Sequence, residues 1–306
     1  MAPSFAKSAL KVLLGLVFVV SAVLKVVDMD KFEIYVYSYH FFSLNASFFV
    51  ARMAIVLELV LGFGLISHCF HKLMWWGSMA MLGGYTLLLM YALVMGRTDS
   101  CHCFGDFLQL DPKQSLIKNG VLMLLFLLIY RMESWKTPFR WLILCLIIMA
   151  STIGVFVASP PDNLTSNFDP EQNLQTELFD AMLDDAPLDS LHLCEGKQVV
   201  CVFSTGCDYC QMAARKLSLM QQFHGFPADR ITYIFMGNEE GMAKFFEQSE
   251  SVPYRAVLYP DVVRLLKVIN GKFPVIVMLD KGQVVHEYGY RNMKEEEIRE
   301  FFLAIR

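Results

Sequence analysis

The chain has 306 residues, of which 55% are hydrophobic, and its mean hydropathy is +0.43. This composition is too apolar for an ordinary soluble protein, and the excess lies in long runs before about residue 158. The formal net charge of −4 argues against a nucleic-acid partner, because a surface that binds phosphates is usually basic. The length leaves room for about two domains.

Apolar stretches in the first half of the chain are long enough to cross a bilayer as helices. They lie near residues 8–27, 47–70, 73–96, 116–131 and 139–158. The first one resembles a signal peptide, but it is long for the hydrophobic part of such a peptide. We therefore expect five membrane-spanning helices in contact with lipid.

The distribution of basic residues in the short connections predicts the orientation of these spans. The N-terminus and the second and fourth connections are predicted to lie inside, because they carry Lys7, Lys11, His71, Lys72, Arg131, Lys136 and Arg140. An odd number of spans then places residues 159–306 outside, in the same compartment as the third connection. Disulfides persist outside the cytoplasm, so cysteines in these two segments are candidates for redox chemistry.

The third connection contains a C-x-C motif, Cys101-His102-Cys103. Two cysteines one residue apart can close a small strained ring, and strained, exposed disulfides tend to be the catalytic ones. A tetrahedral metal site would need ligands from outside this connection, so we expect no metal here. The motif predicts a pair of catalytic thiols.

Glu58 lies near the middle of the second span, where an uncompensated carboxylate is costly. Lys25, near the outer end of the first span, is one candidate partner. Two interpretations stay open. Glu58 forms a buried structural hydrogen bond while Lys25 reaches the interface, or Glu58 and Lys25, with Phe104, form a quinone or proton site.

Three segments of the first half carry a family resemblance. They are Leu14-Gly15-Leu16-Val17-Phe18 with Ser21 and Lys25, then Glu58-Leu59-Val60-Leu61-Gly62, then Cys101-His102-Cys103-Phe104-Gly105. Over about residues 8–131 the chain resembles the MauE/DoxX superfamily of four-helix membrane proteins, and the C-x-C-F-G loop points to the MauE branch. This resemblance implies a membrane component that works with a thioredoxin-like partner in forming periplasmic disulfides. The bundle also resembles vitamin K epoxide reductase-like proteins, which implies a quinone as electron acceptor.

The fifth span is an addition to this four-helix core, and we expect it to tether the next domain. An acidic stretch follows, over residues 159–190, and reads as an extended, solvated linker. Residues 191–306 then have the composition of a soluble domain. Their expected strands are 198–203, 231–235, 256–259, 272–279 and 284–288, and their expected helices are 211–222, 242–248, 262–268 and 295–305.

The soluble part contains a C-x-x-C motif, Cys207-Asp208-Tyr209-Cys210, between the first strand and the first helix. A helix N-terminus stabilises a thiolate through its dipole and its N–H groups. Cys207 is therefore expected to be the attacking thiol, and Cys210 to resolve the mixed disulfide. Cys201, inside the first strand, is expected to be a core residue.

The order strand, C-x-x-C, helix, with Pro274 opening a late hairpin, is similar to the thioredoxin superfamily, in particular its TlpA/ResA-type branch. The resemblance implies that Pro274 is cis and faces the cysteine pair. Gly206 departs from this family, in which a tryptophan usually precedes the first cysteine. This departure predicts a more open surface around the active site.

The sequence thus predicts a membrane α-helical bundle over 1–158, a linker over 159–190 and an α/β thioredoxin-like domain over 191–306. The expected function is a thiol–disulfide oxidoreductase relay in the bacterial inner membrane, with its C-terminal domain periplasmic. Electrons would pass between periplasmic protein thiols, Cys207–Cys210 and Cys101–Cys103, and onward to a quinone. Two alternatives stay open, a carrier of reductant to periplasmic thiols and a non-enzymatic scaffold that docks a client protein. The sequence leaves the direction of electron flow and the oligomeric state undecided.

Overall fold

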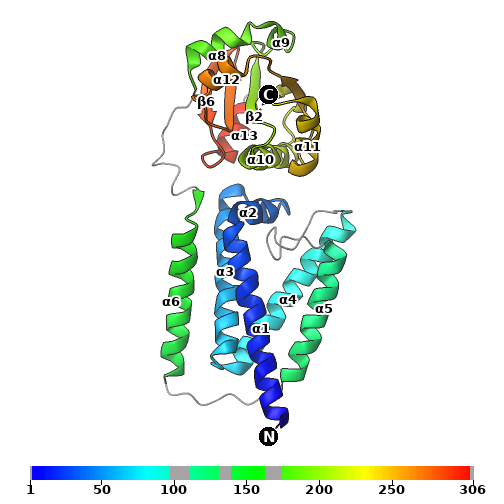
Figure 1. Cartoon of the computed structure of the whole chain (residues 1–306), viewed down its shortest axis with the longest axis vertical. Helices are drawn as coiled ribbons and strands as arrows, with labels where there is room; N and C mark the ends of the chain where they lie inside the picture. The colour runs from blue at the N-terminus through cyan, green and yellow to red at the C-terminus, as the bar shows by residue number, and fades with distance from the viewer. Residues whose placement is uncertain (1, 97–110, 131–138, 163–173, 304–306) are drawn as a thin grey trace. The chain divides into compact units, whose positions relative to one another are not determined.

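The computed structural model describes residues 2–96, 111–130, 139–162 and 174–303. The chain divides into two compact units, Met1–Pro161 and Asp162–Arg306 (Figure 1). The first unit is helical and the second contains the β-sheet.

Long apolar helices dominate the first unit. They are α1 (Ala2–Val27), α3 (Leu44–Ile66), α4 (His71–Val94), α5 (Pro112–Ile129) and α6 (Arg140–Ala158). Five helices of the described residues are long and apolar enough to cross a membrane, which confirms the five expected spans. Their outward side chains include many exposed large hydrophobic residues, such as Leu87, Leu124 and Val157. This chain is therefore a multi-pass membrane protein.

A short helix, α2 (Met29–Tyr37), lies in the first connection and was not expected from the sequence. It is too short and too polar to register as a span. Met29, Phe32 and Tyr37 are buried, and α2 packs against α3. Its Glu33 pairs with Arg52 of α3, and both side chains are almost fully buried.

The backbones of α1 and α3 come close together at two glycines. A Cβ at Gly15 would lie 2.7 Å from the carbonyl oxygen of Gly62, and a Cβ at Gly62 would lie 2.9 Å from that of Gly15. Glycine at both positions lets the two helix backbones touch, as small residues do in membrane proteins. One hydrophobic cluster joins core side chains of all five spans, among them Leu14, Phe18, Leu61, Leu82, Phe126 and Leu144.

The end of α6 is fixed to α3 by a buried arginine. Arg52 Nε donates to the carbonyl oxygen of Ser159 at 2.7 Å, and Arg52 Nη2 donates to that of Pro160 at 2.8 Å. Helix α6 also packs along α3. The expected tethering span is therefore an integral part of the first unit.

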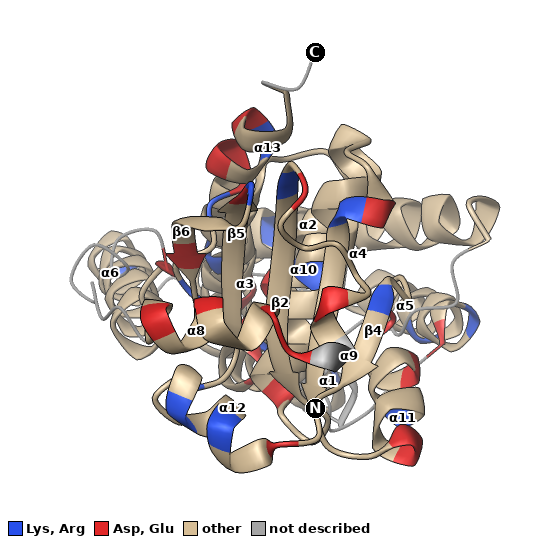
Figure 2. Ribbon diagram, turned by 90° about the horizontal axis from the view of Figure 1, so that it is seen from above, with Lys and Arg blue, Asp and Glu red and all other residues tan. Residues whose placement is uncertain are grey.

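The second unit is built on a five-stranded sheet in the order β4-β3-β2-β5-β6. The strands are β2 (Lys197–Ser204), β3 (Ile231–Met236), β4 (Arg255–Leu258), β5 (Val275–Asp280) and β6 (Gln283–Tyr288). Strand β2 pairs parallel to β3 and antiparallel to β5, and β3 pairs parallel to β4. In Figure 2 the charged residues lie mainly on the surrounding helices and at the strand ends. This mixed sheet has the topology of a thioredoxin-like domain, as the sequence predicted.

Four helical segments connect strands β2 to β5, and one more helix follows β6. The connecting segments are α10 (Asp208–His224), η2 (Ala228–Arg230), α11 (Glu239–Ser249) and α12 (Val262–Val268), and the last helix is α13 (Glu295–Leu303). The interior positions of β2, β3 and β5 are buried, because their Val, Ile and Phe side chains form a continuous apolar layer.

The expected extended linker over 159–190 differs from the structure. Residues 174–190 contain α8 (Thr176–Leu183) and α9 (Ala186–Asp189). Phe179 and Met182 of α8 and Leu188 of α9 are fully buried in the same core as Val200 and Val277. The acidic residues that suggested a solvated linker lie between these apolar anchors, and burial of the anchors stabilises the helices.

Candidate functional site

The C-x-x-C motif lies where β2 passes into α10, as expected. Cys207 is the N-cap of α10 and has extended backbone angles, and its sulfur accepts a hydrogen bond from the Cys210 N–H at 3.3 Å. Cys207 is half-buried, whereas Cys210, one turn further along, is fully buried. A reagent from solution therefore reaches Cys207 first.

The two thiols differ strongly in acidity. Hydrogen bonds from the Cys210 thiol and from the N–H groups of Cys210 and Tyr209 lower the pKa of Cys207 to about 7, although partial burial opposes this shift. Burial raises the pKa of Cys210, and the neighbouring Cys207 raises it further. This asymmetry suits Cys207 as the nucleophile and Cys210 as the protonated partner.

Pro274 lies at the same end of the sheet as the C-x-x-C motif. The Phe273–Pro274 peptide bond is cis, and Pro274 is buried directly before β5. In the antiparallel pairing of β2 with β5, Val202 faces Val275, and the next residues of β2 lead toward Cys207. The fold therefore brings Pro274 toward the cysteine pair, as the family resemblance implied.

Two glycines pack closely against the loop that precedes the motif. Thr205 donates its N–H to the Met236 carbonyl oxygen at 3.1 Å. A Cβ at Gly237, where φ is +151°, would lie 2.3 Å from Thr205 Oγ1, and a Cβ at Gly241 would lie 2.9 Å from the same atom. The turn after β3 thus packs closely under the active-site loop and requires glycine at 237.

The rim of the site carries an exposed aromatic residue from the motif itself. Tyr209 is 45% exposed, and its ring centre lies 5.3 Å from that of Tyr290. Arg291 lies 5.8 Å from the Tyr209 ring. On the other side no atom of the described residues lies within 4 Å of a Cβ built at Gly206. The surface beside Cys207 is open there, as the loss of the usual tryptophan predicted.

The remaining described cysteines occupy different surroundings. Cys201 is fully buried in β2, and burial raises its pKa, in agreement with its expected place in the core. Cys194 is exposed before β2. In the first unit, Cys69 is buried between α3 and α4, while Cys145 is exposed on α6.

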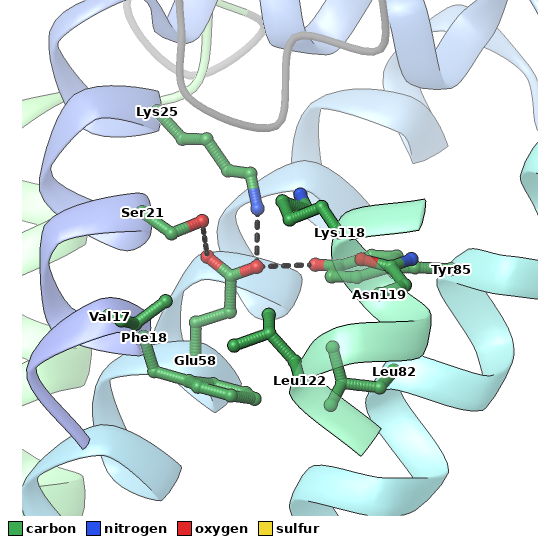
Figure 3. Close-up of a pocket in the computed structure, with 10 residues that line it drawn as sticks. All are labelled: Val17, Phe18, Ser21, Lys25, Glu58, Leu82, Tyr85, Lys118, Asn119 and Leu122. Carbon is green, nitrogen blue, oxygen red and sulfur yellow. Dashed lines mark hydrogen bonds and ion pairs between the residues drawn. The ribbon is translucent and has the colours of Figure 1, made fainter. Parts of the chain in front are cut away.

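A second polar site lies inside the helical bundle. Lys25 of α1 donates a hydrogen bond to Glu58 of α3, and each side chain is only 2–3% exposed. The Glu58 carboxylate also accepts a hydrogen bond from Ser21 at 3.4 Å and one from the Tyr85 hydroxyl of α4 at 2.8 Å. Figure 3 shows these three donors converging on the carboxylate. The pairing of Glu58 with Lys25, one of the sequence-based expectations, is confirmed.

The space beside this carboxylate is small. It has a volume of about 30 Å³, and Lys118 and Asn119 of α5 complete its lining with apolar residues (Figure 3). This is room for a water-sized group. A quinone ring therefore does not fit beside Glu58 within the bundle, although Glu58, Lys25 and Tyr85 have the right groups to exchange protons with one.

Sequence reasoning missed Tyr85 as a member of this site. The Tyr85 side chain places a polar hydroxyl group within an apolar span. A polar group in a span is a signal of a functional site, as the carboxylate of Glu58 is. Asn119 of α5 also lines this site. Its amide donates to Thr86 at 3.3 Å, which links α5 to α4 beside the carboxylate.

Three of the predicted site residues, Cys101, Cys103 and Phe104, lie outside the described residues. Their expected roles as a second thiol pair and as part of a quinone site stay predictions.

The two units together define a class of protein. It is a multi-pass membrane protein whose helical region is joined to a thioredoxin-like domain with a C-x-x-C motif. The comparisons agree with this assignment. Residues 4–132 match the family model of the methylamine utilisation protein MauE, so this part of the chain is a MauE-type membrane region.

A curated relative spans both units. The chain is 24% identical to Protein TlpB of Flavobacterium psychrophilum, over 83% of this chain and 83% of that protein. No solved structure matches the chain. The fusion of a MauE-type membrane region to a thioredoxin-like domain, expected from the sequence, is thereby confirmed, whereas the wider resemblance to DoxX and to vitamin K epoxide reductase-like proteins stays a prediction.

Proposed function

We propose that this protein is a membrane-bound thiol–disulfide oxidoreductase that forms disulfides in periplasmic proteins. The observation that carries the proposal is the Cys207–Cys210 pair. An accessible thiol with a pKa of about 7 stands at a helix N-terminus, beside a buried thiol with a raised pKa. Such a pair attacks a disulfide or resolves one within a protein.

In the proposed relay, client dithiols reduce the Cys207–Cys210 disulfide and become oxidised themselves. Cys207–Cys210 then passes two electrons and two protons to the Cys101–Cys103 disulfide. The membrane region transfers them to a quinone, which leaves as the hydroquinone. The inner membrane is the proposed location, with residues 162–306 on the periplasmic side, where disulfides persist.

The positions of the other cysteines favour this scheme over a carrier of reductant. A thiol-based carrier across the membrane needs two cysteines that meet within the spans. Cys69 is buried between α3 and α4, and Cys145 is exposed on the outside of α6. These two thiols have different surroundings, one enclosed and one facing outward, and they are far apart in the sequence.

A thiol-trapping experiment on membranes tests the proposal. The full chain is reduced, the reductant is removed, and the redox state of Cys207 and Cys210 is followed with and without decylubiquinone. We expect reoxidation only with the quinone and only when both Cys101 and Cys103 are present. Cys145→Ser serves as the control, because it removes an exposed thiol of the spans without touching either pair.

If Cys103→Ser reoxidises as fast as Cys145→Ser, the relay is wrong. If a Cys207→Ser/Cys210→Ser variant supports disulfide formation in cells as well as the wild type, the protein acts as a scaffold.

A further inference from the structure

The cavity beside Glu58 is large enough to hold water. Its volume is about 30 Å³. One water molecule needs about 10–15 Å³ of such space and two to four polar partners. Polar side chains of four helices line the cavity, namely Ser21 and Lys25 of α1, Glu58 of α3, Tyr85 of α4, and Lys118 and Asn119 of α5. The cavity therefore has both the size and the polar lining that a bound water molecule requires.

The two oxygen atoms of the Glu58 carboxylate are used unequally. Oε1 accepts hydrogen bonds from Lys25 and from the Tyr85 hydroxyl. In the part of the chain that the structure describes, Oε2 accepts one long hydrogen bond, from Ser21 at 3.4 Å. Each carboxylate oxygen has room for about two donors. Oε2 is therefore the atom that can accept a further hydrogen bond from water.

Lys118 is the charged group that connects this cavity to the surface. Of the three charged side chains in the described lining, Lys25 and Glu58 are each 2% exposed, whereas Lys118 is half-buried. Lys118 lies in the second turn of α5, and the exposed residues Asp111 and Lys113 mark this end of the helix as its polar end. Figure 3 shows Lys118 on the same side of the carboxylate as Lys25. A proton that enters the cavity from solvent would therefore pass Lys118.

We propose that this cavity binds water, and that the water connects Lys118 to Glu58, so that the buried carboxylate exchanges protons with the solvent at the start of α5. A buried carboxylate and a half-buried ammonium group that share a water-sized polar cavity carry this inference. It goes beyond the proposed function, because it concerns protons alone and holds for either direction of electron flow.

The proposed step moves one proton and no electrons. An N–H bond of the Lys118 ammonium group breaks, the bound water takes up that proton and gives up another, and an O–H bond forms on Glu58. Lys118 then recovers a proton from bulk water, and the reverse steps release the proton again. The other titratable groups that face the carboxylate are Lys25 from α1 and Tyr85 from α4, and both keep their protons as hydrogen-bond donors.

Two leucines of α5 allow a matched test of the bound water. Leu122 lines the cavity, whereas Leu124 is 64% exposed and lies outside its described lining. Leu122→Phe should fill the cavity, while Leu124→Phe adds the same side chain on the exposed face of the helix. The full-length protein in lipid nanodiscs is studied by infrared difference spectroscopy between an acid and an alkaline buffer, in ordinary water and in H₂¹⁸O.

We expect the wild type and Leu124→Phe to show a band of ordered internal water that shifts with the oxygen isotope, and Leu122→Phe to lack it. The circular dichroism spectrum of each variant checks that its helices are formed. An equally strong water band in Leu122→Phe and Leu124→Phe would overturn the water site.

Two lysines of α5 test the proton route, and neither substitution changes the core. Lys118→Met removes the proposed route, and Lys113→Met removes an exposed lysine outside the described lining of the cavity. The same spectra report the C=O band of a protonated carboxyl group, which Glu58→Gln assigns to Glu58. After a pH jump this band should appear about 10²-fold more slowly in Lys118→Met, as expected when a positioned proton donor is lost.

Lys113→Met should keep the rate of the wild type. Equal rates in Lys118→Met and Lys113→Met would overturn the inference, and so would a wild type in which Glu58 gives no carboxyl band in the acid buffer.

These measurements need no electron transfer, so they separate the inference from the proposed function. If the thiol-trapping experiment fails while the water band and the Lys118→Met rate behave as expected, the relay is wrong and the proton site stands. If thiol trapping succeeds while Lys118→Met matches Lys113→Met, the relay stands and the proton site is wrong.

Discussion

The chemistry of the cysteine pair depends on the different surroundings of its two thiols, which are chemically identical side chains. Cys207 is half-buried and receives hydrogen bonds at the start of α10, while Cys210 is fully enclosed. The C-x-x-C spacing predicted this arrangement, because residues three apart at a helix N-terminus occupy the cap and the first turn. The size of the pKa difference arises from burial and could not be predicted from the motif.

The alkylation of Cys207 by iodoacetamide should depend on pH with a midpoint near 7. Because the pKa is lowered, the reactive thiolate persists as the pH falls to about 7 and is lost below it. The rate at Cys207 is measured by peptide mass spectrometry on the reduced protein. In denaturant the midpoint should move up to about 8.5, the ordinary value of a thiol. A midpoint that is the same in the folded and the denatured protein would contradict the prediction.

The ion pair of Lys25 and Glu58 is a second feature that depends on individual residues. Both charges are buried, so neither is stable alone in this environment. The sequence identified both residues, because ionisable groups within apolar spans are conspicuous. Their contact, and the Tyr85 and Ser21 hydroxyls that complete it, depend on the packing of α1, α3 and α4.

Removing one member of this pair should destabilise the protein more than removing both charges. Lys25→Met should lower the free energy of unfolding by about 3–5 kcal/mol, because it leaves a buried carboxylate without its counter-charge. Lys25→Met/Glu58→Gln should recover most of this loss. The measurement is SDS-induced unfolding of the purified membrane protein. A double variant that is as unstable as Lys25→Met would show that the charges do not interact.

Among the elements, the contact between α1 and α3 determines where the buried site forms. Gly15 and Gly62 let the backbones touch. Ser21, Lys25 and Glu58 lie on the same pair of helices. The sequence showed glycines in both spans but not that they face each other. That result depends on the rotation of each helix about its axis, which packing sets.

Gly15→Ala should therefore weaken the bundle. The added methyl group would lie 2.7 Å from the Gly62 carbonyl oxygen, a backbone atom that cannot move alone. We expect a loss of about 1–3 kcal/mol in the same unfolding assay, as for other overpacked sites. Gly120→Ala is the matched control, because no atom of the described residues lies within 4 Å of its Cβ. Equal stability of both variants would contradict the role of the glycine contact.

Two further elements show the limits of patterns read along the chain. Helix α2 has only nine residues, and α8 lies within an acidic stretch, so neither matched the criteria for a span or a domain helix. Both are stabilised by apolar residues that become buried only against other elements, Phe32 in α2 and Phe179 in α8. Short helices of this kind take their stability from tertiary contacts.

At the scale of the whole molecule, the chain joins a MauE-type membrane region to a thioredoxin-like domain. Each unit has its own apolar core, and each carries a site with chemistry of its own. A single chain keeps the concentration of one unit near the other high, which favours exchange between their thiols. In the proposed relay, the fusion would let the two thiol pairs exchange even when the protein is scarce.

The proposed orientation predicts which thiols a membrane-impermeant maleimide reaches in intact spheroplasts. After reduction, Cys207 should be labelled without permeabilisation, because residues 162–306 are proposed to be periplasmic. A cysteine placed at the exposed Lys72 by K72C should be labelled only after permeabilisation, since the connection before α4 is expected inside. Labelling is read by mass spectrometry of both positions. The reverse pattern would invert the topology and remove the oxidising compartment that the relay needs.

The sequence by itself determined the five spans, the thioredoxin-like order of strands and helices, and the cysteine pair at the start of α10. Each of these is encoded locally, by the length of an apolar run, by alternation of side chains or by spacing within one helical turn. Only the tertiary structure decided that Lys25 and Tyr85 meet at Glu58 and that Gly15 touches Gly62. Contacts between distant segments depend on how helices rotate and cross, which is a property of the whole packed bundle.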